Sequence, residues 1–134
     1  MNIRTETMSD FFTKYHLEGP WPFPAVIHHF TAPDRGDPHD HPWSFRSFVL
    51  KGGYRERVFY HRGFTQEKTR RPGDSFIIES GHIHKIEELL DGDCWTLIMP
   101  LGPSERKSGF YQFREEGSYH RFWDEAEFRR MPRT

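Results

Sequence analysis

Two His-x-His pairs in this chain have the residue type and the spacing that a metal site requires. The first is His39-Asp40-His41, and the second is His82-Ile83-His84. In a β-strand, residues i and i+2 point to the same face of the sheet, so each pair can present two imidazoles on one side. Two such pairs on neighbouring strands can converge on one ion. Because neutral imidazole suits iron, zinc, copper and nickel, the sequence predicts a buried metal centre.

The size and charge of the chain narrow the classes of protein to consider. Its 134 residues match one domain, so we expect residues 1–134 to form a single domain. The 19 basic and 20 acidic residues give a formal net charge of −1, which favours neither nucleic acid nor an anionic membrane as a partner. The mean hydropathy of −0.86 is polar, but an aromatic content of 16% predicts a compact aromatic core.

Cysteine content and hydrophobic runs bear on the compartment. Cys94 is the single cysteine, so no intrachain disulfide can form. No apolar run approaches the roughly 20 residues of a membrane-spanning helix. Residues 1–10 are polar and have no apolar signal segment. We therefore expect a cytoplasmic protein without a membrane partner.

Short apolar segments between Gly and Pro turns predict an all-β sandwich or barrel. The expected strands cover residues 25–31, 45–50, 54–60, 76–78, 82–87, 95–99 and 110–113. Ser9-Asp10 predicts the cap of a short helix that ends near Leu17, and residues 123–131 have the pattern of an amphipathic helix. We expect segments 1–24 and about 122–131 to pack outside a core barrel of residues 25–114.

The run from about residue 39 to residue 100 resembles a cupin, a double-stranded β-helix of the jelly-roll type. The first cupin motif stands here as His39-Asp40-His41 followed by Val49-Leu50-Lys51-Gly52. The second stands as Pro72-Gly73-Asp74 followed by Gly81-His82-Ile83-His84. The resemblance implies an all-β jelly-roll barrel in which His39, His41 and His84 bind the metal.

One position departs from the usual motif. The acidic ligand of the family falls at Phe45, which cannot bind a metal, so the chain is similar to the three-His variant of thiol dioxygenases and some other cupin oxygenases. Three neutral ligands leave a divalent ion its full charge and open positions for substrate and O₂ or water. The resemblance favours Fe(II), with zinc, nickel or manganese as alternatives.

The strand after the first motif supplies further candidates. Alignment with the family pattern puts Tyr54, Glu56, Val58 and Tyr60 on its inner face. Glu56 is then a fourth ligand, a residue that orients an imidazole, or a general base; the alternative is an exposed ion pair with Arg55 or Arg57. Tyr54 is expected to hydrogen-bond substrate.

Three other positions leave their roles open. His82 shares its face with His84, so it is either a fourth ligand or a hydrogen-bond donor behind the ligands. His28 and His29 face opposite sides of their strand, so one of them can look inward. Arg106 either clamps a carboxylate or lies in solvent.

The sequence favours a small-molecule oxygenase that depends on Fe(II) held by three histidines. One alternative is a metal-assisted isomerase or lyase acting on a sugar or small acid, with Glu56 as the base. Another is a ligand-binding cupin without catalysis, because fold alone does not choose among these functions. Each reading has a small molecule as the partner, and a homodimer remains open.

Overall fold

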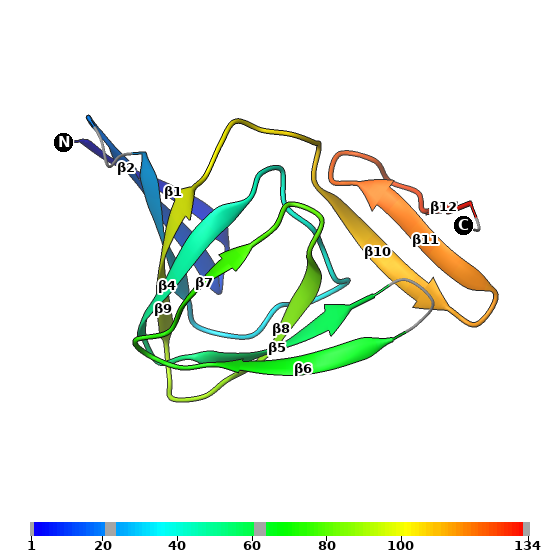
Figure 1. Cartoon of the computed structure of the whole chain (residues 1–134), viewed down its shortest axis with the longest axis horizontal. Helices are drawn as coiled ribbons and strands as arrows, with labels where there is room; N and C mark the ends of the chain where they lie inside the picture. The colour runs from blue at the N-terminus through cyan, green and yellow to red at the C-terminus, as the bar shows by residue number, and fades with distance from the viewer. Residues whose placement is uncertain (1, 21–23, 61–63, 133–134) are drawn as a thin grey trace.

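The structure is a computed structural model that describes residues 2–20, 24–60 and 64–132 (Figure 1). Within these ranges it contains strands and no helix. The strands are β1 (Asn2–Ser9), β2 (Phe12–Glu18), β3 (Ala25–Phe30), β4 (Phe45–Lys51), β5 (Tyr54–Phe59), β6 (Thr65–Arg70), β7 (Ser75–Ile78), β8 (Ile83–Leu89), β9 (Cys94–Pro100), β10 (Gly109–Arg114), β11 (Gly117–Phe122) and β12 (Arg129–Arg130).

The strands form two antiparallel layers with a space between them. One layer is a six-stranded sheet in the order β1-β2-β3-β9-β4-β7, and the other comprises the sheets β6-β5-β8 and β10-β11-β12. His39 joins these two smaller sheets, because it forms isolated antiparallel bridges with His84 on β8 and Phe110 on β10. Figure 1 shows β4, β7 and β9 on one side of the central space and β5, β6 and β8 below it.

Alternation along the strands fills the space between the layers. Phe45, Ser47 and Val49 of β4 are buried, while the residues between them are partly exposed. The core has two groups of buried apolar side chains, one around Phe30, Val49, Tyr54, Ile86 and Cys94 and the other around Val26, Phe45, Ile78 and Ile98. Burying one such aliphatic or aromatic side chain contributes about 1.5–3 kcal/mol, so this pattern drives the two layers together.

Gly52 closes the connection between β4 and β5. Its φ is +85°, and a Cβ at this position would lie 2.2 Å from the carbonyl oxygen of Asp93. Both the left-handed backbone and the close approach require glycine. The turn fixes where β5 starts and so which of its residues face inward.

The strand prediction for β5 is correct except at its end. Tyr54, Glu56 and Val58 are buried on the inner face. Tyr60 was expected beside them, but it lies after the strand with 45% of its surface exposed, and its hydroxyl donates to Gln66 Oε1 at 3.1 Å. The alternation stops there because β5 ends at Phe59.

The predicted N-terminal helix is wrong. Residues up to Leu17 form the hairpin of β1 and β2, which pair antiparallel and extend the six-stranded sheet. Ser9 does not cap a helix; its Oγ accepts a hydrogen bond from Phe11 N at 3.3 Å within the hairpin turn. Serine satisfies a nearby N–H in either setting, so the cap signal was ambiguous and strand pairing decided the outcome.

The predicted C-terminal helix is wrong as well. A turn follows β11, and β12 then pairs with β11 through Tyr119 and Arg130. The Glu125 carboxylate accepts from Phe122 N at 3.0 Å and from Arg129 at 2.7 Å. These contacts tie the segment to the sheet, and that pairing overrides its amphipathic pattern.

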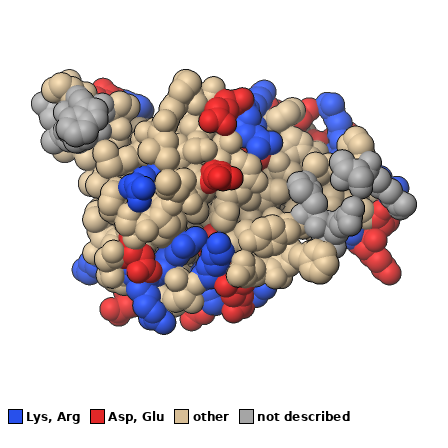
Figure 2. Space-filling view, viewed as in Figure 1, with Lys and Arg blue, Asp and Glu red and all other residues tan. Residues whose placement is uncertain are grey.

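Acidic and basic side chains are mixed on the face shown in Figure 2, including the region where Figure 1 places β5, β6 and β8. On the outer face of β5, Arg55 and Arg57 form ion pairs with Glu67 and Glu87. Among the residues that the structure describes, none forms a helix long and apolar enough to cross a membrane.

Candidate metal centre

Three histidines from two segments meet inside the barrel. His84 lies on β8, and His39 hydrogen-bonds to it through two backbone contacts of 2.9 and 3.0 Å. His41 N donates to the Ser80 carbonyl at 3.1 Å, which ties the same loop to the end of β7. Each of the three imidazoles offers a nitrogen within 4.8 Å of the others. The structure therefore brings the three predicted ligands into one cluster.

The cluster favours the neutral form of imidazole, which is the form that binds metals. Burial, followed by the charge of His84, lowers the pKa of His39 to about 3. The same two causes hold the pKa of His41 well below its ordinary value. At neutral pH these two side chains are therefore uncharged, with nitrogen lone pairs free to bind an ion.

The hydrogen bonds around the cluster leave metal-binding atoms without protein partners. His41 Nδ1 is buried and has no hydrogen-bond partner among the described residues. His84 Nδ1 lies 3.3 Å from the Glu56 carboxylate, which leaves Nε2 of His84 as its free nitrogen. Three clustered imidazoles, one of them with an unpaired buried nitrogen, fit a divalent ion of the transition series.

Glu56 lies behind His84, at the centre of a buried polar network. Its side chain is 0% exposed, its Oε1 is 2.9 Å from His82 Nε2, and its Oε2 accepts from Arg70 Nε at 3.2 Å. Burial by itself would raise the pKa of Glu56, but hydrogen bonds from His82 and His84 and the charge of Arg70 outweigh it and lower that pKa. The carboxylate is thus ionised and held by three side chains.

The alternative for Glu56, an exposed ion pair with Arg55 or Arg57, does not describe its contacts. Arg55 and Arg57 point to the outer surface, where they pair with Glu67, Glu87 and, for Arg55, Glu88. They belong to the opposite face of β5, because successive side chains in a strand alternate. Glu56 is therefore an inward carboxylate and not part of the exposed ion pairs.

His82 stands beside Glu56 and His84, and its ring centroid is 5.1 Å from that of His84. Glu56, His82 and His84 form a second group of potential ligand atoms within 4.8 Å, sharing His84 with the first. Neither Glu56 nor His82 is among the described residues that line the adjoining cavity. This placement puts His82 behind the ligands, as a donor to the carboxylate that contacts His84.

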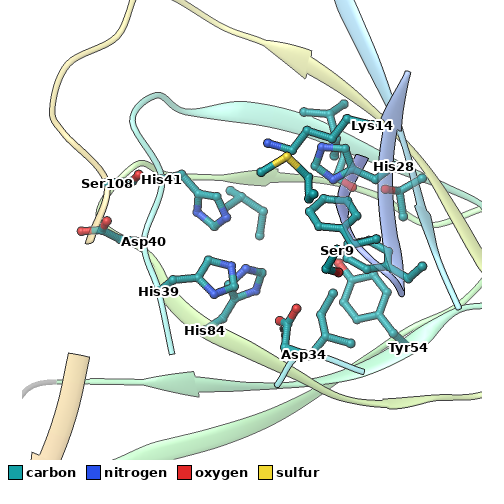
Figure 3. A pocket seen from close by; sticks show the side chains of 18 of the residues that line it. Ser9, Lys14, His28, Asp34, His39, Asp40, His41, Tyr54, His84 and Ser108 are labelled. Carbon is teal, nitrogen blue, oxygen red and sulfur yellow. Dashed lines mark hydrogen bonds between the residues drawn. The ribbon is translucent and has the colours of Figure 1, made fainter. Parts of the chain in front are cut away.

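The three histidines open onto a cavity of about 350 Å³ between the two layers (Figure 3). Its walls are largely apolar, with Phe30, Phe45 and Ile98 among them, and Tyr54 also lines it. Burial, and then the Glu56 charge, hold the pKa of Tyr54 well above its ordinary value. Tyr54 therefore keeps its proton, and a hydrogen bond to the Glu56 carboxylate contributes to the raised pKa.

The N-terminal hairpin closes one side of this cavity. Phe12 and Lys14 of β2 contribute to the wall, next to His28 of β3. His28 is thus the inward residue of the His28-His29 pair, whereas His29 stacks on Trp95 with ring centroids 3.8 Å apart. Sequence reasoning missed Lys14, because it placed this residue on a helix; strand alternation through Phe12 and Lys14 was the available signal.

Asp40 anchors the loop that carries two of the ligands. Its carboxylate is buried and accepts from Tyr111 Oη at 2.6 Å and Gly109 N at 2.8 Å. Arg106 lies 3.5 Å from the same carboxylate, so this arginine does face a carboxylate, but one supplied by the protein. These contacts tie the His39-His41 loop to β10, a strand remote in sequence.

We predict that Tyr111→Phe lowers the free energy of unfolding by about 1.5–3 kcal/mol, the range for a hydrogen bond to a charged group. The phenolic O–H is lost while the buried Asp40 carboxylate remains. Urea denaturation measures the change. Tyr119→Phe is the control, because its hydroxyl bonds to Glu116 at the surface. A loss at Tyr111 no larger than at Tyr119 would contradict an anchoring role.

Comparison with solved structures identifies the fold. Hydroxypropylphosphonic acid epoxidase from S. wedmorenis matches with a TM-score of 0.58 and 14% identity, over 74% of this chain and 55% of that one. The DMSP lyase from Ruegeria pomeroyi DSS-3 matches with a TM-score of 0.56 and 24% identity, over 74% and 51%. Oxalate decarboxylase from Bacillus subtilis matches with a TM-score of 0.57 and 16% identity, over 75% and 28%.

These matches confirm the predicted cupin fold. Because the sequence identities are low, the matches support a conclusion about the fold and none about the function. The chain spans about half the length of the epoxidase and the lyase, and less of the decarboxylase. No protein-family model matches the sequence, and no curated protein matches it either. The similar structures include an epoxidase, a lyase and a decarboxylase, which catalyse different reactions, so the function has to be argued from the site itself.

Proposed function

We propose that this cupin is a metal-dependent enzyme that oxidises a small molecule with O₂, and that His39, His41 and His84 hold Fe(II). The observation that carries the proposal is the donor set: three imidazoles, with those of His39 and His41 held neutral, on one wall of a largely apolar cavity. Bound there, iron would supply the electron transfer to O₂ that protein side chains cannot provide. A dioxygenation, in which both oxygen atoms end in the product, needs no further reductant.

The side chains around the metal would hold the reactants and exclude water. The cavity has the volume of about a dozen water molecules, at roughly 30 Å³ each, which suits a small substrate and not a polymer. Its apolar walls favour the carbon skeleton of such a substrate. Tyr54 would orient it through a hydrogen bond from the wall.

The contacts of Glu56 favour a positioning role over that of a general base. A base must reach the substrate proton, directly or through one water. Glu56 is not among the described residues that line the cavity, and His82, His84 and Arg70 contact its carboxylate oxygens. These contacts weaken the isomerase and lyase alternative, which needed Glu56 as the base. The carboxylate instead fixes the ring and tautomer of His84, as carboxylates commonly do behind a metal-bound histidine.

Oxygen uptake tests the proposal. We expect protein loaded with Fe(II) under anaerobic conditions to consume O₂ when small thiols or small acids from a panel are added, measured with an oxygen electrode. Uptake should be absent with zinc and in the His84→Ala variant. Turnover without O₂ in zinc- or manganese-loaded protein would overturn it in favour of an isomerase or lyase. Ligands that bind and are recovered unchanged would indicate a binding protein.

A further inference from the structure

The cavity has a cationic end away from the metal-binding histidines. Figure 3 shows Lys14 and His28 together on the side of the cavity that faces His39, His41 and His84 across the open space. Lys14 on β2 and His28 on β3 are register partners, so adjacent strands place them side by side. The ring of Phe12 packs edge-on to His28 with centroids 5.0 Å apart, which fixes the imidazole.

The ammonium of Lys14 has no anionic partner within 4 Å among the described residues. The natural candidate is Glu6, which faces Lys14 in the β1–β2 register. However, Glu6 Oε1 is 2.8 Å from His16 Nε2 and is therefore already engaged. Arg35, the other basic residue on the cavity wall, is exposed and lies over the ring of Phe11 at 5.0 Å.

The carboxylates that line the cavity, in contrast, already have donors. Asp34 accepts from Ile86 N at 2.8 Å, and Asp37 accepts from Gln112 at 3.3 Å. Asp40 accepts from Tyr111 and from Gly109. At the end of the cavity formed by Lys14 and His28, the unmet requirement is therefore for an anion.

Burial makes this requirement stronger. Removal from water lowers the pKa of Lys14, although the charge of Glu6 opposes the effect. The Lys14 ammonium lies 5.7 Å from the centroid of the Phe12 ring, a contact that attracts a cation but supplies no anion. Its burial still costs free energy that a bound anion would offset. A divalent ion held by three uncharged ligands would add positive charge at the other end.

We propose that Lys14 and His28 bind the anionic group of the substrate, which is then a small carboxylate whose apolar body lies along the phenylalanines toward the three histidines. The proposal rests on the proposed function for the identity of the bound molecule as a substrate. Lys14 supplies the charge, and the neutral imidazole of His28 donates a second hydrogen bond to the same group. The N-terminal hairpin, outside the general cupin motif, therefore sets substrate specificity.

Calorimetric titration with benzoate and its neutral isostere benzamide tests this assignment on the full chain, both free of metal and loaded with zinc. We expect wild-type protein to bind benzoate at least about tenfold more tightly than benzamide, the factor for one hydrogen bond to a charged group. Lys14→Met should lose this preference, and Lys14→Arg should keep most of it. The control Lys51→Met, which removes an exposed lysine, should behave as wild type.

A melting temperature separates ligand binding from a structural role. Lys14→Met removes an unpaired, partly buried charge, so its melting temperature should equal or exceed that of wild type while benzoate affinity falls. In wild type, an NMR titration should show one lysine whose pKa rises when benzoate is added, a readout that needs no variant to fold.

Three results would overturn the proposal: equal affinity of wild type for the two probes, no binding of benzoate, or a benzoate preference that survives in Lys14→Met. Benzoate binding that depends on zinc and not on Lys14 would assign anion recognition to the metal, and so would also overturn it. Lys14-dependent binding in a protein that takes up no iron would leave the carboxylate site standing and remove the proposed oxygenase function.

Discussion

His41→Ala and His84→Ala are each expected to reduce bound iron from near one equivalent per chain to below about a tenth of that value. A three-His site has no redundant protein ligand, so the loss of one imidazole removes one of the three bonds between the protein and the ion. His41 contributes a buried nitrogen that has no other partner among the described residues, and His84 contributes the nitrogen opposite its Glu56 contact. Elemental analysis of anaerobically purified protein measures the effect.

His29→Ala is the matched control for the loss of an imidazole. His29 belongs to the outer face of β3, where it stacks on Trp95 and bonds to Asp93 at 2.9 Å. This variant should keep its iron. Iron retained in both ligand variants would contradict the assignment, as would wild-type protein that binds no metal after reconstitution. Stoichiometric zinc or nickel in place of iron would support the assignment of the metal ligands but not the proposed iron-dependent oxidation.

The cupin resemblance is the reason that the ligand cluster could be predicted from the sequence. It pointed to His39, His41 and His84, and the bridge between His39 and His84 brings their segments together. The alternation of side chains along a strand put Tyr54 and Glu56 on the inner face of β5, where the structure has them. Local patterns of this kind predict the structure well because one face of each strand must be buried.

The rest of the site depends on contacts that no local pattern contains. Asp40 stands between two ligand histidines, but its partners Tyr111 and Gly109 lie on β10, about seventy residues later. Lys14 reached the cavity only because residues 2–18 form a hairpin and not the expected helix. Ser9 satisfied an N–H in a turn, a role that its sequence context shares with helix capping.

Glu56→Gln is expected to lower metal affinity by about 10–100-fold, the usual effect of losing the partner behind a metal-bound histidine. The amide keeps the size of the side chain, but it removes the negative charge that His82, His84 and Arg70 surround. The imidazole of His84 then loses the carboxylate that fixes its tautomer. Competition with a chromophoric chelator measures the affinity, and Glu67→Gln, on the exposed face of the same sheet, is the control.

Activity at saturating metal separates two of the roles that the sequence left open for Glu56, those of a positioning residue and a general base. A positioning residue affects how tightly the ion is held, so Glu56→Gln should regain most of its turnover once enough iron is supplied. A general base contributes about 10²–10⁴-fold to the chemical step, and excess metal would not restore that loss. Because Glu56 does not line the cavity and its carboxylate contacts His82, His84 and Arg70, we expect recovery. Persistent loss of turnover in a fully metal-loaded variant would identify Glu56 as the base and favour an isomerase or lyase over an oxygenase.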